Sequence, residues 1–226
     1  GGNWSFFSVQ ATGNLTVTGN GTIDAKENDC FTFDVRDGGI LTIKDGTFTG
    51  NISSVYLINE AGTGVSTCNI EGGTFSIKQI DGTGGYNFLL NCLDASYKNN
   101  TAKFNVTGGS FVNFNPANNL AEGAETNFCA AGYEAVQDGD VWTVQKAPVA
   151  QIGDVKYTSL AEAFTAATDG QTITVLTDID LPSTIAVTKQ VTLDLAGKTI
   201  SNTSDLWAGG NWSFFSVQAT GNLTVT

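Results

Sequence analysis

The sequence contains no histidine, no methionine and a single arginine, Arg36. Without an imidazole it cannot build a Ser-His-Asp triad, a Cys-His dyad or a histidine-ligated zinc site. The lack of methionine leads us to expect an internal or processed stretch with no signal peptide. These absences remove many common catalytic chemistries before any motif is considered.

Basic residues are also scarce, with 10 Lys and Arg against 22 Asp and Glu and a formal net charge of −12. Nucleic-acid binding and adsorption to an anionic membrane both need a basic surface, so neither partner is expected, nor is a membrane-spanning segment. Glycine, by contrast, is abundant at 27 residues, together with Thr and Asn. This composition predicts a soluble, turn-rich, mostly β protein.

The two ends of the sequence are identical. Residues 1–18, GGNWSFFSVQATGNLTVT, recur without a change as residues 209–226, at an offset of 208. The simplest interpretation is one period, plus an overlap, of a tandem array of near-identical units. An engineered permutation and a local duplication of one hairpin are the alternatives.

A boundary between units is predicted at residues 146–148. Residues 132–146 and residues 149–160 each read as a hairpin, with turns at Asp138-Gly139 and Gly153-Asp154. Residues 1–146 are therefore expected to be the C-terminal part of one unit. Residues 147–226 are expected to hold a linker, a capping helix and the first coils of the next unit.

One convincing helix is predicted, beginning at Ser159. Ser159 and Glu162 form a capping box, in which the serine accepts the Glu162 backbone N–H and the glutamate side chain reaches back. The helix then carries one apolar stripe at helical spacing, formed by Leu160, Ala163, Phe164 and Ala167. We expect its Leu160 and Phe164 face to cover an open strand edge.

A shorter period lies inside the unit. A phrase ending in Gly-x-Thr/Ser-apolar returns at residues 193–200, 15–23, 41–48, 68–75 and 104–111. A second family of short apolar runs alternates with it, at residues 5–13, 30–38, 54–62 and 87–95. Read through the 208-residue period, the first phrase recurs every 25–36 residues.

Two alternating strand families with glycine corners predict an all-β fold. The predicted form is a right-handed parallel β-helix (solenoid) with one short capping α-helix and terminal β-hairpins. Ile, Val, Leu and Phe would point inward, while Asn and Thr would form hydrogen-bonded rows from coil to coil. An antiparallel sandwich is the alternative, although sandwich strands usually recur at shorter spacing.

Two long stretches carry a family resemblance. Residues 149–201, VAQIGDVKYTSLAEAF onward, resemble the opening of the right-handed parallel β-helix repeats of large bacterial surface proteins, within the pectate-lyase-like superfamily architecture. Residues 108–144 resemble the closing segment of the same modules. The resemblance implies the architecture and not an activity, because that superfamily holds lyases, hydrolases, tailspikes and inert stalks.

Two acidic clusters and one basic pair are the candidates for chemistry. The clusters are Asp178, Asp180 and Asp194, and Asp34, Asp37 and Asp45. Either could form a calcium site or a carboxylate pair, or be a solvated acidic face. A lyase resembling the superfamily would use Arg36 as its base with Lys44 nearby. We assign no catalytic residue, no metal site and no cofactor.

Four cysteines occur at positions without metal-ligand spacing: Cys30, Cys68, Cys92 and Cys129. They are interpreted as buried thiols, with one disulfide between adjacent coils as the alternative. Cys68 takes the place of Leu41 and Phe104 in its phrase, which predicts an inward side chain.

Five aromatic residues could form a sugar-stacking platform: Trp4, Phe6, Phe7, Tyr86 and Trp212. Trp4 and Trp207 lie near glycine corners and could line an interface. Phenylalanines in a solenoid are more often core residues. Several N-x-S/T triplets also occur, as expected by chance where Asn and Thr are abundant.

The leading functional interpretation is a structural repeat of an extracellular or cell-surface fibre, stalk or adhesin, without catalytic activity. Its partners would be other copies, in a filament or an end-to-end array, and surface glycans. The predicted unit junction comprises Tyr133, Trp142, Pro148, Ile152 and Val155. The alternative is a carbohydrate-binding or polysaccharide-degrading β-helix, such as a lyase or a tailspike-like module.

Overall fold

The computed structural model describes residues 4–27, 29–80, 87–203 and 213–226. They form a mostly β structure that divides into two compact units, Gly1–Lys146 and Ala147–Thr226. The division falls at the predicted boundary. Each unit has its own buried apolar cluster and is described by itself.

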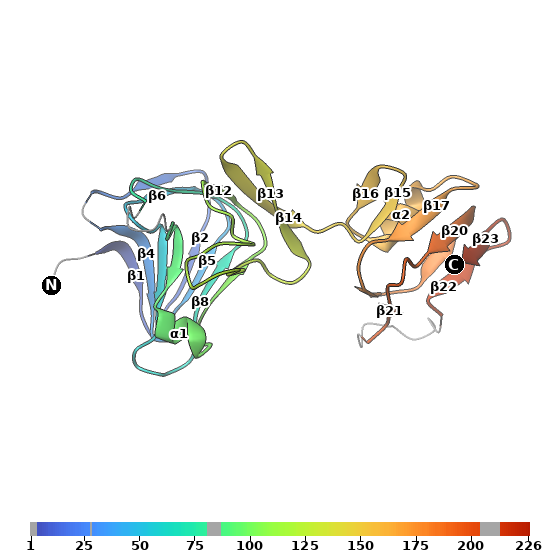
Figure 1. Ribbon diagram of the computed structural model, residues 1–226. Helices are drawn as coiled ribbons and strands as arrows, with labels where there is room; N and C mark the ends of the chain where they lie inside the picture. The colour runs from blue at the N-terminus through green and yellow to red at the C-terminus, as the bar shows by residue number, and fades with distance from the viewer. Residues whose placement is uncertain (1–3, 28, 81–86, 204–212) are drawn as a thin grey trace. The chain divides into compact units, whose positions relative to one another are not determined.

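Unit 1 is built from three sheets of parallel strands, which the chain visits in the same order four times (Figure 1). The first sheet contains β1 (Ser5–Val9), β4 (Phe31–Arg36), β7 (Val55–Ile58) and β10 (Leu90–Cys92). The second contains β2 (Asn14–Val17), β5 (Ile40–Ile43), β8 (Ser66–Ile70) and β11 (Ala102–Val106). The third contains β3 (Thr22–Asp24), β6 (Thr47–Gly50), β9 (Thr74–Ile77) and β12 (Ser110–Val112). Because neighbouring strands in these sheets are parallel, an antiparallel sandwich does not describe this unit.

The interior of unit 1 is a column of stacked apolar side chains. Alternate residues of β5, β6, β8 and β11 are buried, as the two-residue period of a strand predicts. Phe48, Phe75 and Phe111 occupy equivalent positions of β6, β9 and β12, and successive ring centroids lie 5.2 Å apart. Cys68 is likewise in register with Leu41 and Phe104 and is fully buried, as predicted.

Polar side chains form matching rows on the outside. Asn105 donates through Nδ2 to Asn69 Oδ1 at 2.8 Å, and Asn69 donates to Thr42 Oγ1 at 3.4 Å. Thr49 and Ser76 hydroxyls lie 2.9 Å apart on the neighbouring sheet. The predicted hydrogen bonds between stacked Asn and Thr residues are therefore present.

The last strands of unit 1 have covered edges. β14 (Val141–Lys146) pairs antiparallel with β12, and β13 (Tyr133–Asp138) pairs with β14 as the predicted hairpin. Val106 of β11 forms a bridge with Cys129. The Cys92 N–H of β10 donates to Glu122 Oε1 at 2.6 Å. All three sheets thus find hydrogen-bond partners at this end. One short helix, α1 (Asp94–Lys98), follows β10 and has no counterpart in the sequence-based expectations.

Unit 2 begins with a second hairpin, β15 (Ala150–Ile152) and β16 (Val155–Tyr157). After α2 (Leu160–Ala166), the strands are β17 (Thr172–Val175), β18 (Ile179–Asp180), β19 (Ile185–Val187), β20 (Gln190–Asp194), β21 (Ile200–Ser201), β22 (Phe215–Val217) and β23 (Asn222–Val225). They form a five-stranded sheet, β16-β15-β17-β20-β23, and two pairs, β18-β21 and β19-β22. The pairings from β17 onward are parallel.

The predicted helix is present as α2, with one difference at its cap. Ser159 Oγ accepts the Glu162 N–H at 3.1 Å, whereas the Glu162 carboxylate accepts from Thr158 Oγ1 at 3.2 Å. Leu160 and Phe164 are buried, as the apolar stripe predicts.

The structure differs from the expectation about this helix at β17, whose edge is covered by a hairpin strand and not by α2. The edge of β17 is paired with β15, through Ala150 with Val175 and Gln151 with Thr174. A helix satisfies its backbone groups internally and has none to offer a strand edge, whereas a hairpin strand does. The apolar face of α2 instead closes the interior, where Phe164 lies 5.5 Å from Phe215.

Candidate functional site

The residues proposed for lyase chemistry are held in local contacts. Arg36 Nε donates to Asp34 Oδ2 at 2.7 Å, and this hydrogen bond raises the pKa of Arg36 above its ordinary value. A guanidinium stabilised in its charged form is a poor proton acceptor. Lys44 follows β5 of the second sheet, and its Nζ lies 3.9 Å from Glu71 Oε2. The two basic residues therefore pair with different carboxylates.

Five of the six carboxylates in the predicted acidic clusters accept hydrogen bonds from backbone N–H groups. Asp37 Oδ1 accepts the N–H groups of Glu60 and Ala61, at 2.8 and 2.9 Å. Asp180 accepts from the backbone and hydroxyl of Thr203, both at 2.7 Å, which lowers the pKa of this carboxyl. Three more of these carboxylates accept backbone N–H groups, Asp45 from Gly46, Asp178 from Thr199 and Asp194 from Ala196, while Asp34 accepts Arg36 Nε. Within the described residues, no three His, Cys, Asp or Glu side chains are grouped to hold a metal ion.

All four cysteines are free thiols in the structure. Cys30, Cys68 and Cys92 are buried, and burial raises the pKa of Cys68 and Cys92 far above the usual range. Cys129 is half-buried, and its pKa is raised to about 11. Thiols with raised pKa values are weak nucleophiles at neutral pH, so these positions behave as small apolar residues.

One titratable residue has a setting that the sequence did not reveal. Glu122 lies in a loop, and desolvation by burial raises its pKa to about 7, although its hydrogen bond from Cys92 N–H acts in the opposite direction. Its Oε2 is buried without a hydrogen-bond partner. The surrounding residues, NLAEGAET, carry no motif that would have singled it out. Its place at the end of β10 makes it part of the covered edge.

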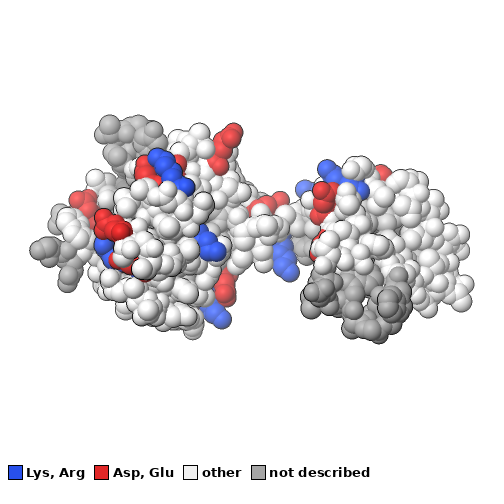
Figure 2. Space-filling view, turned by 90° about the horizontal axis from the view of Figure 1, so that it is seen from below, with Lys and Arg blue, Asp and Glu red and all other residues white. Residues whose placement is uncertain are grey.

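Surface charge is sparse. Figure 2 shows Lys and Arg side chains scattered singly among small groups of Asp and Glu, with most of the visible face uncharged. Among the described residues, no helix is long and apolar enough to span a membrane.

The predicted junction residues have different settings in the two units. Tyr133 and Trp142 pack partly buried against the core of unit 1. In unit 2, Ile152 is buried, Val155 is exposed and Pro148 lies in the segment before β15. Their joint role at a junction stays a prediction.

Exposed aromatic side chains lie on β1 and at the residue just before it. Trp4 and Phe6 are 52% and 54% exposed, and Phe7 is 45% exposed. The other proposed platform residues, Tyr86 and Trp212, and the proposed interface residue Trp207 lie outside the described residues.

The identical segments lie at two sheet edges, one in each unit. β1 and β2 pair only with β4 and β5, and β22 and β23 pair only with β19 and β20. At these two ends no described strand covers the outer side, in contrast to the ends closed by hairpins. An exposed strand edge is a template for another strand. Comparison with protein-family models, with curated proteins and with solved structures gives no match to this chain.

Proposed function

We propose that this chain is a structural repeat of an extracellular fibre, stalk or adhesin, assembled from right-handed parallel β-helix units in tandem. The observation that carries the proposal is the ordered passage of the chain through three parallel sheets, four times in unit 1. Each pass adds one strand to every sheet. Such a structure grows along one axis, which is the geometry that a fibre requires.

The side-chain rows support the same proposal. Phe48, Phe75 and Phe111 form an apolar column inside, and Asn69 and Asn105 a hydrogen-bonded row outside. Each residue binds its equivalents one strand away, so every added strand meets a surface that already matches it. This mutual fit gives stiffness along the stacking direction. The extracellular location rests on the resemblance to bacterial surface modules and on the acidic, Asn- and Thr-rich composition.

A carbohydrate-binding module is the second candidate, favoured by the exposed Phe6 on β1 and the exposed Trp4 just before it. Sugars stack on exposed aromatic faces. A polysaccharide panel with added calcium, read by binding and by the ultraviolet absorbance of unsaturated products, tests this candidate. Binding that is lost in Trp4→Ala would support it, and no binding to any member would reject it.

The fibre proposal is tested on a chain that carries several periods. Negative-stain imaging should show straight rods, and fibre diffraction should give a meridional reflection at about 4.8 Å, the spacing of stacked strands. Flexible beads without that reflection would contradict the proposal. A Phe75→Ala version of the same chain is the matched control, because it removes one ring from the apolar column and should shorten or bend the rods.

A further inference from the structure

A small pocket lies on the loop that follows β12 in unit 1. It has a volume of about 170 Å³, and its walls come from one residue before β10 and six residues of this loop. Five of the seven are asparagines and none is charged; the full set is Asn87, Asn113, Phe114, Asn115, Asn118, Asn119 and Leu120. The pocket therefore offers amide groups as nearly its whole polar lining.

Two of the asparagines build the wall of the pocket. Asn87 Nδ2 donates to the backbone carbonyl of Asn113 at 2.7 Å. Asn119 Nδ2 donates to the backbone carbonyls of Asn115 and Thr126, at 3.2 and 3.0 Å. The side-chain oxygens of Asn87 and Asn119 also accept backbone N–H groups, and Asn119 and Thr126 exchange two backbone hydrogen bonds. These bonds hold the pocket in shape before any ligand arrives.

The other three asparagines have amide groups to spare. Asn115 Oδ1 accepts the Ala117 N–H at 2.9 Å, whereas its Nδ2 reaches solvent and donates to no described residue. Asn113 and Asn118 are exposed, and their side chains form no hydrogen bond within the described ranges. A side-chain amide supplies two N–H donors and one carbonyl acceptor. The pocket thus holds free donors and free acceptors together.

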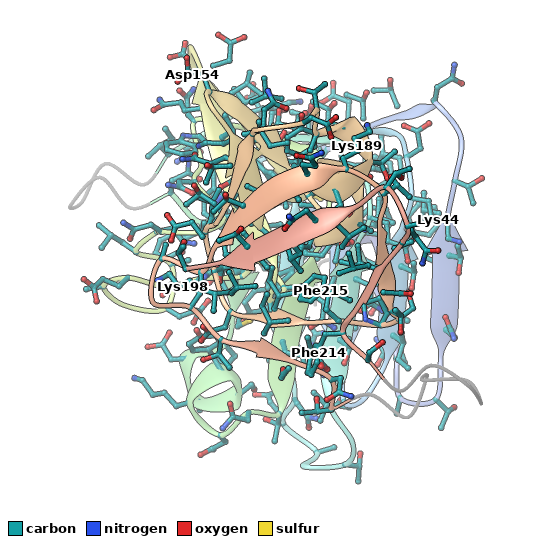
Figure 3. All side chains as sticks on the ribbon, turned by 90° about the vertical axis from the view of Figure 1, so that its right-hand side faces the viewer. Lys44, Asp154, Lys189, Lys198, Phe214 and Phe215 are labelled. Carbon is teal, nitrogen blue, oxygen red and sulfur yellow. The ribbon has the colours of Figure 1, made fainter. Side chains whose placement is uncertain are left out.

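This chemistry suits a neutral, hydroxyl-rich ligand. A hydroxyl group both donates and accepts, so adjacent hydroxyls can pair with the two ends of one amide. An ionic ligand would need a charged partner in the pocket, and none lines it. Turns of unit 2, in contrast, carry Asp154, Lys189 and Lys198, which lie at its margin in Figure 3. The net charge of −12 further disfavours anions.

The pocket also has an apolar side. Phe114 is buried at 2% exposure, while Leu120 is 49% exposed at the rim. A sugar ring presents C–H groups on its faces and hydroxyls at its edge, so it can contact an apolar side chain and amides at once. Ligand sites commonly combine apolar walls with a few polar groups that fix orientation.

The size of the pocket limits what can enter. Sites for drug-sized molecules measure about 300–1,000 Å³, and this pocket is smaller, at about 170 Å³. Asn113, Asn118 and Leu120 are exposed, so the rest of a longer ligand could extend into solvent. A single sugar residue at the end of a glycan fits these dimensions.

We propose that this pocket binds a neutral terminal sugar of a glycan, through the side-chain amides of Asn113, Asn115 and Asn118 and the apolar side chain of Leu120. The inference goes beyond the fibre proposal, because the pocket is complete within unit 1. It also differs from the aromatic platform at β1, since β1 and β10 are opposite edges of the first sheet.

Repetition would make a weak site effective. A single sugar in an open pocket binds with a Kd of about 1–10 mM. In a chain of several periods the pocket recurs once in each period, and several sites on one chain bind a glycan-covered surface with higher avidity than one site. This step alone rests on the fibre proposal.

Saturation-transfer NMR on the chain tests the pocket. The probes are the methyl glycosides of glucose, galactose, mannose and N-acetylglucosamine, with glucuronate as an anionic probe. We expect saturation transfer to at least one neutral glycoside, with a Kd of about 1–10 mM, and none to glucuronate.

Two variants remove free amide groups without removing the bonds that shape the pocket. Asn118→Ala deletes an exposed amide, and Asn115→Asp keeps the acceptor for Ala117 N–H while replacing the donor by a negative charge. Each should weaken binding about fivefold to tenfold. Asn20→Ala is the matched control, because Asn20 is exposed in the turn between β2 and β3, outside the pocket. It should bind as the native chain does, and circular dichroism verifies that all three variants are folded.

Three results would overturn the proposal: no binding of any neutral glycoside, binding unchanged in Asn118→Ala and Asn115→Asp, and tighter binding of glucuronate than of the neutral probes. Binding that is lost in Trp4→Ala but kept in the pocket variants would assign the sugar to β1 instead. Rods from a multi-period chain that binds no sugar would keep the fibre proposal and reject the pocket. Sugar binding by a chain that forms flexible beads would do the reverse.

Discussion

Single side chains in unit 1 take their environment from the residues one strand away. Phe75 lies between Phe48 and Phe111, and Cys68 lies between Leu41 and Phe104. This is why the Cys68 thiol is inert and the Phe75 ring is fully buried. Glu122 is the exception, because it accepts the Cys92 N–H of β10, the last described strand of the first sheet.

Glu122→Gln should change how stability depends on pH. The pKa of Glu122 is raised from 4.5 to about 7 in the folded chain, so the folded state binds this proton more tightly than the unfolded state between those values. The free energy of unfolding of the native chain should therefore fall as the pH rises through that window. Because the side chain is only half-buried, solvent screens part of the effect, and we expect a loss of roughly 1 kcal/mol.

The measurement is urea unfolding at about pH 4.5 and about pH 8, with the glutamine variant retaining the acceptor for Cys92 N–H. The variant should equal the native chain at the lower pH and exceed it in stability at the higher pH. Equal pH dependence in the two proteins would contradict the assignment to Glu122.

At the scale of elements, the corners determine how closely strands stack. A Cβ on Gly72 would overlap the carbonyl oxygen of Lys44, on the preceding pass of the chain. A Cβ on Gly108 would overlap the carbonyl oxygen of Glu71 in the same manner. Glycine at these two positions is thus required by the close backbone approach between successive passes.

Gly72→Ala should destabilise unit 1 by about 2 kcal/mol, because the added methyl pushes two backbone segments apart. Gly21→Ala is the matched control: Gly21 belongs to the same phrase, at the uncovered end, and a Cβ there meets nothing within 4 Å. Thermal unfolding of the two variants should show a lower midpoint for the first only. Equal midpoints would show that the corner tolerates a side chain.

At the scale of the whole molecule, the two units are complementary: each has one end closed by a hairpin and one end that carries the repeated segment. Sheet edges are the main route of unwanted association in β proteins. In each unit the hairpin and the repeated segment lie at opposite edges of the described sheet order.

A permuted chain gives a direct measure of this complementarity. Residues 147–226 joined directly to residues 19–146 would contain the segment once, between both sets of neighbours. We expect a monomer with one cooperative unfolding transition at a higher temperature than any transition of the native order, because Val217 and its neighbours become buried. Calorimetry and sedimentation check both points. Two separate transitions would show that the units do not merge.

Much of the local structure was predictable. The two hairpins, the helix beginning at Ser159 and the inward position of Cys68 follow from turn residues, a capping pattern and alignment within a phrase, and all are present. The element that covers the β17 edge was not predictable, because it depends on which segment lies beside that edge in the folded chain. In the structure that segment is β15 and not the helix. Glu122 was missed for the same reason, since a loop glutamate acquires its pKa only from what buries it.

The sequence by itself determined the all-β character, the two nested periods and the identity of residues 1–18 and 209–226, since these are properties of pattern and need no contacts. The tertiary structure decided which side of each copy is paired and which is open. Strand pairing joins residues that are distant in the chain, and a strand has two edges that its sequence cannot tell apart. Only the neighbouring strands, β4 and β5 for one copy and β19 and β20 for the other, distinguish them.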